Sequence, residues 1–115
     1  MEFTVEFYET PDGRPVIEDE LNALQSTAPV LYDLLVAGLN KLRCREFHRP
    51  PLCEPLGGGL FELRVGRKDI ARAAWFFQKG QRIVVVRCFV KKSRKTPQGE
   101  LELARKRMAE YLNRN

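Results

Sequence analysis

The strongest chemical signal in this sequence is a run of basic residues that stands just before a predicted helix. Lys91, Lys92, Arg94 and Lys95 occupy four of five positions, and Thr96-Pro97 follows, where a helix can begin. A helix N-terminus already attracts anions, so cations beside it raise the local positive potential further. The arrangement favours a phosphate-binding site, and the alternative is a solvated basic turn.

Three further arginines lie in segments where apolar and polar residues alternate. Because alternate side chains of a strand point to the same face, Arg64, Arg72 and Arg87 can share one face of a sheet. Exposed Phe76 and Phe89 beside them would offer flat surfaces for unstacked bases. Arginine with aromatic rings therefore indicates single-stranded RNA as a ligand. The alternative is an ordinary polar sheet face whose two phenylalanines are covered.

Proton transfer has fewer obvious candidates. His48 is the residue type best suited to it near neutral pH, but it follows a predicted helix beside Arg49, away from the strands. A histidine that binds free carbonyls at the helix end is the alternative interpretation. Lys92 or Lys95 could act as acid or base if neighbouring cations lower its pKa.

Cysteines and histidine do not form a metal motif. Three cysteines without C-x-x-C spacing and one histidine make structural zinc and a disulfide framework unexpected. We therefore expect neither a metal nor another cofactor.

The elements that must position these residues can be predicted from periodicity. An alternating segment at Glu2–Tyr8 predicts a strand, and two apolar stripes at helical spacing predict helices from Pro15 and over Pro29–Arg45. Three prolines and three glycines then predict an irregular connection over Arg49–Gly59. Strands at Phe61–Val65, Ile70–Phe77 and Arg82–Val90 and a final helix beginning at Pro97, capped by Thr96, complete the chain. The predicted fold is α+β, β-α-α-β-β-β-α, with an antiparallel-rich sheet and helices packed on one side.

Length and charge bound the function class. At 115 residues the chain is expected to be a single domain, residues 1–115, and without an apolar run of membrane-spanning length or a signal peptide it is expected to be cytoplasmic. Residues 1–33 carry eight acids and one base, whereas residues 34–115 carry nineteen bases and seven acids. The basic part is typical of a phosphate-binding surface. The acidic part, which includes Glu18, Asp19 and Glu20, is expected to orient the domain's field toward RNA.

Three segments together resemble the phage-derived, HigB-like toxins of the RelE/ParE superfamily. They are Pro55–Arg64 (PLGGGLFELR), Arg72–Phe77 (RAAWFF) and Phe89–Pro97 (FVKKSRKTP), and the element order matches as well. The resemblance implies a RelE-like fold and a toxin that cleaves messenger RNA, usually on the ribosome, and that a small cognate antitoxin protein inhibits.

The resemblance also implies roles for individual residues. Arg64 and Arg72 would contact the scissile phosphate, and the basic run would supply further charge and an acid or base. The predicted catalytic residues are Arg64, Arg72, Lys92 and Lys95, with His48 as a possible acid or base, and the predicted RNA-binding residues are Arg67, Lys68, Arg87, Lys91 and Arg94. Two other functions stay open: a non-catalytic inhibitor that binds DNA gyrase or another protein, as in the ParE branch, and a basic nucleic-acid-binding domain.

Overall fold

The protein is built on one five-stranded sheet, which a computed structural model describes for residues 2–91 and 96–114. The strand order is β1-β5-β4-β3-β2, with β1 parallel to β5 and the other pairs antiparallel. The elements in chain order are β1 (Thr4–Phe7), α1 (Val16–Thr27), α2 (Pro29–Lys41), the 3-10 turn η1 (Arg45–Phe47), β2 (Cys53–Gly57), β3 (Leu60–Gly66), β4 (Ile70–Gln78), β5 (Arg82–Lys91) and α3 (Gln98–Leu112).

The predicted α+β fold is confirmed, and the three consecutive strands lie where the alternation placed them. The irregular connection predicted over residues 49–59 is wrong in part, because β2 forms within it. β2 lies at the edge of the sheet, where Pro55 is tolerated since its missing N–H removes no bond from an inner strand. Three successive glycines with positive φ, beginning at Gly57 (φ 93°), then make the tight turn into β3.

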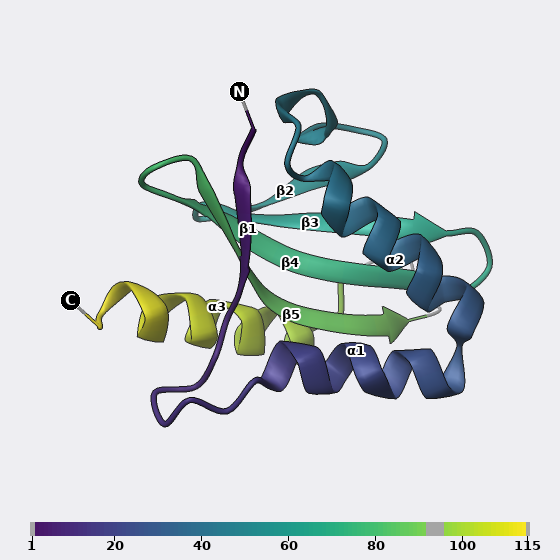
Figure 1. Cartoon of the computed structure of the whole chain (residues 1–115), viewed down its shortest axis with the longest axis horizontal. Helices are drawn as coiled ribbons and strands as arrows, with labels where there is room; N and C mark the ends of the chain where they lie inside the picture. Colours follow the sequence, from purple (N-terminus) through teal and green to yellow (C-terminus); the bar gives the residue numbers. More distant parts are fainter. Residues whose placement is uncertain (1, 92–95, 115) are drawn as a thin grey trace.

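The helices cover both faces of the sheet, so the prediction that they pack on one side is wrong (Figure 1). In α2, Gly38 lies against Leu63 and Val65, which point to one face of β3. In α3, Tyr111 packs against Phe76, which points to the opposite face of β4. We call these the α1/α2 face and the α3 face. This division decides which side chains of the sheet are covered and by which helix.

The core lies mainly between the sheet and the α1/α2 pair. The apolar stripes predicted for the first two helices contribute to it, and Ile17 of α1 and Leu35 of α2 are completely buried in the core. The second helix ends at Lys41, earlier than the predicted Arg45, and η1 follows. Burial of these stripes provides most of the stability of the helices, because neither α1 nor α2 has a side-chain N-cap.

α3 begins at Gln98, and the prediction that Thr96 caps it is wrong. Pro97 is the N-cap residue and makes no side-chain cap bond. The Thr96 hydroxyl instead bonds to side chains of the sheet. The predicted inner face of α3 is confirmed, since Ala104 is buried and Leu101, Met108 and Tyr111 pack against the core. Among the described residues, no helix is both long and apolar enough to cross a membrane.

Candidate active site

Strand register brings two arginines together on the α3 face. Arg64 of β3 and Arg72 of β4 are direct Cα partners, so their side chains leave the sheet side by side. Two like charges at directly opposed positions repel each other and require a counter-ion. On the same face, Glu62 lies two residues before Arg64, and Glu54 of β2 is the direct partner of Glu62.

Glu62 is that counter-ion, and it is itself buried at 3% exposure. Its Oε1 lies 3.4 Å from Nη1 of Arg72 and 3.8 Å from Nε of Arg64. The Thr96 hydroxyl donates to Glu62 and accepts from Nη1 of Arg72 at 3.1 Å. We call Glu54, Glu62, Arg64, Arg72 and Thr96 the Glu62 cluster. Thr96 ties the start of α3 to the centre of the sheet through it.

The two arginines of the cluster differ in their access to solvent. Arg72 is completely buried, whereas the side chain of Arg64 is 29% exposed. The second partner of Arg64 is Glu54, whose Oε2 lies 3.6 Å from Nη1 and whose side chain is 50% exposed. Arg64 and Glu54 therefore form the part of the cluster that an external ligand reaches first.

Glu54 and Glu62 were not predicted as site residues from the sequence. The alternation of β3 places Glu62 on the same face as Arg64, which was a usable signal. Glu54 gave no comparable signal, because it lies in β2, and Pro55 and the glycines that follow it had indicated an irregular connection in place of a strand.

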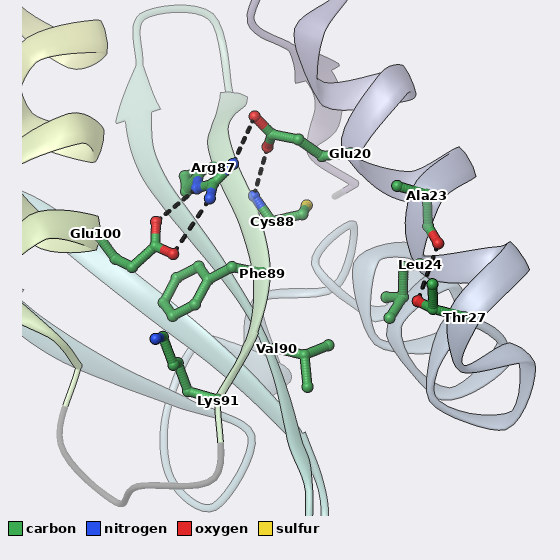
Figure 2. Close-up of a pocket in the computed structure, with 10 residues that line it drawn as sticks. All are labelled: Glu20, Ala23, Leu24, Thr27, Arg87, Cys88, Phe89, Val90, Lys91 and Glu100. Carbon is green, nitrogen blue, oxygen red and sulfur yellow. Dashed lines mark hydrogen bonds and ion pairs between the residues drawn. The ribbon is translucent and has the colours of Figure 1, made fainter.

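Arg87, a predicted RNA-binding residue, is held between two carboxylates (Figure 2). Its Nε and Nη2 donate to Glu100 of α3 at 2.7 and 3.1 Å, and its Nη1 lies 2.9 Å from Glu20 of α1. Burial acts to lower the pKa of Arg87, but the bonds to Glu100 and Glu20 outweigh it and raise the pKa above its ordinary value. Arg87 is thus a cation whose charge is already neutralised within the protein.

Glu20 connects three elements and is not a free surface acid. Besides Arg87, it accepts a bond from Arg107 of α3 at 2.8 Å and from the backbone N–H of Cys88 at 2.9 Å. Glu18 and Asp19, its neighbours in the acidic segment, are exposed. Of the three acids Glu18, Asp19 and Glu20, the first two are therefore the exposed ones, and the expected effect of the acidic segment on the electrostatic field stays a prediction.

The expected aromatic surface for stacking bases is absent from the described part of the α3 face. Phe76 is 2% exposed and packs against Tyr111, with ring centroids 5.6 Å apart. Phe89 is 8% exposed and lies beside the Arg87 guanidinium. The prediction that both rings are exposed is wrong, because α3 covers this face and was expected on the other. The shared face of Arg64, Arg72 and Arg87 is nevertheless as the alternation predicted.

His48 lies on the α1/α2 face, away from the Glu62 cluster. Its Nε2 is 2.6 Å from the carbonyl oxygen of Leu42, which follows the last residue of α2. Its ring packs against Phe3 at 4.8 Å and Phe77 at 5.3 Å. The sheet separates this ring from Arg72, and its contacts match the alternative interpretation of a histidine bound to a helix-end carbonyl.

The remaining predicted residues are basic. Lys91 is exposed at the end of β5, on the same side of the strand as Arg87 and Phe89 (Figure 2). Arg67 and Lys68 are exposed in the turn between β3 and β4. Lys92, Arg94 and Lys95 lie outside the described residues. Within the described residues, no group of three or more His, Cys, Asp or Glu is arranged to hold a metal ion.

The Glu62 cluster combines two functions that phosphate chemistry needs. Arg64 presents a guanidinium, whose fork of N–H donors fits phosphate oxygens. Glu54 presents a half-exposed carboxylate next to it, which can accept a proton. The buried Glu62, which also pairs with Arg72, lies 3.8 Å from Arg64 and helps to hold the Arg64 side chain in place.

Comparison with known protein families agrees with this architecture. The model of the family described as phage-derived protein Gp49-like (DUF891) matches residues 19–109, which include most of α1, all elements from α2 to β5 and most of α3. No curated protein matches the chain. The chain therefore belongs to the Gp49-like family of phage-derived proteins, within the HigB-like part of the RelE/ParE toxin superfamily.

Proposed function

We propose that this protein is the toxin of a type II toxin–antitoxin system and that it inhibits translation by cleaving messenger RNA. The observation that carries the proposal is the pair of Arg64 and Glu54, a phosphate-binding cation beside a half-exposed carboxylate. Family membership supports a toxin and implies an antitoxin protein as its partner. Cleavage of RNA, on the ribosome or off it, is the part of the proposal that experiment must test.

The proposed reaction needs no group beyond RNA and the side chains of this chain. The Glu54 carboxylate takes the proton of a ribose 2′-hydroxyl, whose oxygen then bonds to the adjacent phosphorus. Arg64 stabilises the negative charge that develops on the phosphate oxygens. The bond from phosphorus to the 5′ oxygen breaks, and that oxygen takes up a proton. The products are a 2′,3′-cyclic phosphate and a 5′-hydroxyl end.

The basic residues from 91 to 95 are proposed to bind the RNA backbone and to donate the proton that the leaving 5′ oxygen takes up. Lys91 is exposed beside the α3 face, and Lys92 and Lys95 remain the candidates for the acid that protonates the leaving oxygen. Arg67 and Lys68 in the β3–β4 turn would extend the binding surface. Arg72 is proposed to act with Arg64 on the phosphate. Because Arg72 is completely buried, direct contact would require Thr96 to move from its place over it.

The experiment is to induce the protein in growing cells and to map the 5′ ends of cellular messages. Arg64→Gln and Glu54→Gln are the informative variants, since both side chains reach solvent and neither supports the core. Arg72→Ala is a poor choice, because it leaves Glu62 buried without its closest cation. Lys79→Gln, in the β4–β5 turn, is the control.

New 5′ ends inside translated codons, lost in Arg64→Gln and Glu54→Gln but retained in Lys79→Gln, are the expected result. Growth arrest without new ends would overturn the ribonuclease proposal and favour a protein target such as DNA gyrase. Absence of arrest together with binding to RNA would favour a basic nucleic-acid-binding domain. Sequencing with and without 5′ phosphorylation checks the predicted 5′-hydroxyl chemistry.

A further inference from the structure

A cleft opens beside the Glu62 cluster, at the end of β3 where β2 no longer covers the sheet edge. It has a volume of about 670 Å³ and lies between α2, η1, residues 49–52 and the last residues of β3. Volumes of this order are typical of small-ligand sites. Its walls come from segments distant in sequence, so only the fold creates it.

The charge of the cleft is predominantly positive. Lys41 of α2, Arg49 of the connection before β2, and Arg64 of β3 line it, against the single carboxylate of Glu46. Lys41 and Arg49 are both exposed, and no ion pair is recorded for either among the described residues. Their charges are therefore available to a ligand, unlike that of Arg87. An anionic ligand fits this balance.

Apolar surface lies next to these cations. Leu34, Leu52 and Val65 line the same cleft, together with the half-buried ring of Phe47. The Lys41 ammonium lies 5.4 Å from the centroid of that ring. A flat apolar wall with cations at its margin matches a nucleotide, whose base is flat and whose phosphate is charged.

Arg64 belongs both to the Glu62 cluster and to the cleft. A single-stranded RNA with one phosphate at Arg64 therefore has its neighbouring nucleotide at the cleft. We propose that the cleft is a subsite for the nucleotide that flanks the cleaved bond, with Lys41 and Arg49 binding its phosphate and Phe47 contacting its base. This inference rests on the proposed function and adds a place where RNA sequence is read.

The test measures binding of a six-nucleotide RNA that carries 2′-O-methyl groups and a 5′ fluorescein, so that cleavage cannot occur. Fluorescence anisotropy is recorded at several salt concentrations for the wild type, for the cleft variants Lys41→Gln, Arg49→Gln and Phe47→Leu, and for Arg64→Gln. Lys79→Gln is the matched control, because Lys79 is exposed in the turn between β4 and β5 and is not one of the residues that line the cleft. Thermal unfolding of each variant verifies the fold.

Lys41→Gln and Arg49→Gln are expected to weaken binding about fivefold each, as the loss of one exposed charged contact does. Each should also lower the salt dependence of binding by about 0.7 in log–log slope, the effect of one phosphate contact on a single strand. Phe47→Leu should weaken binding without changing that slope, because it removes a ring and no charge. Lys79→Gln should bind as the wild type does.

The outcomes separate this inference from the proposed function. Wild-type affinity in Lys41→Gln and Arg49→Gln, with weakened binding in Arg64→Gln, would overturn the subsite and leave the ribonuclease proposal intact. Equal loss in Lys79→Gln would also overturn it, since it would show only the effect of net charge. Failure of the wild type to bind the RNA at all would contradict the subsite. The proposed function would still be tested separately, by the mapping of 5′ ends of messages in cells.

Discussion

Glu62 and Arg72 are diagonal neighbours on adjacent strands, on the same face of the sheet and both buried, with Oε1 of the carboxylate 3.4 Å from Nη1 of the guanidinium. A charge in the interior is tolerated only with a partner, so each of these residues determines whether the other can remain. Their pairing also explains how Arg64 can stand directly opposite Arg72, because Glu62 lies close to both.

Breaking this pair from one side should destabilise the protein strongly. Glu62→Leu and Arg72→Met are each expected to lower the free energy of unfolding by about 3 kcal/mol, because each removes an ion-pair partner from a charge that stays buried. The double variant should lose less than the sum of the two by at least about 1 kcal/mol. Urea unfolding of the four proteins measures this coupling. Simple additivity would show that the pair does not act as a unit.

Glu20 should matter for stability far more than its acidic neighbours do. Glu20→Gln is expected to cost about 2 kcal/mol, because the amide cannot replace the ion pairs with Arg87 and Arg107. Glu18 lies two residues before Glu20 in the same helix and is exposed. The free energy of unfolding of Glu18→Gln should therefore stay within about 0.5 kcal/mol of the wild type. Denaturant midpoints provide the comparison, and similar losses in both variants would contradict the role assigned to Glu20.

Stability should fall at alkaline pH through the buried thiols. Burial raises the pKa of Cys53 from its ordinary 9.0 to about 11 and raises that of Cys88 as well. Between about pH 9 and 11 the unfolded chain loses the Cys53 proton while the folded protein keeps it, so unfolding becomes easier as the pH rises. Below pH 9 both states keep the proton and this effect is absent.

The measurement is urea unfolding at pH 8, 9, 10 and 11, with Cys53→Ala as the comparison. The variant is expected to start less stable at pH 8, because it loses buried volume, and to lose less stability between pH 9 and 11 than the wild type. Parallel pH profiles for the two proteins would show that Cys53 does not carry the effect.

Two glycines should respond to alanine in opposite directions. At Gly99, in the first turn of α3, an added Cβ meets no atom within 4 Å, so Gly99→Ala should stabilise the protein by about 0.5–1 kcal/mol. At Gly66, φ is +104° and the Cβ would collide with the carbonyl oxygen of Asp69, so Gly66→Ala should destabilise it. Thermal unfolding of both variants tests the pair, and a lower melting temperature for Gly99→Ala would be the contrary result.

Much of the fold could be predicted from local patterns. The alternation of residues 61–65, 70–77 and 82–90 specified β3, β4 and β5, and the stripes through Ile17 and Leu35 specified α1 and α2. Those patterns are local because a strand or helix repeats its exposure every two or 3.6 residues. Alternation was also sufficient to place Arg64, Arg72 and Arg87 on one face.

Composition hid β2 from the same reasoning. Pro55 and Gly57 read as breakers, yet an edge strand needs bonds on one side only and tolerates them. Because β2 was not predicted, Glu54, the exposed carboxylate of the candidate site, was not predicted either.

The sequence by itself determined the kinds of element, the excess of positive charge after residue 33 and the family of the protein. Only the tertiary structure decided which of those charges are free, because an ion pair depends on which segments meet and not on their spacing in the chain. α3 packs on the face opposite α1 and α2, so it covers Phe76 and brings Glu100 to Arg87. Arg64, by contrast, stays partly exposed, because it belongs to the Glu62 cluster and also lines the cleft.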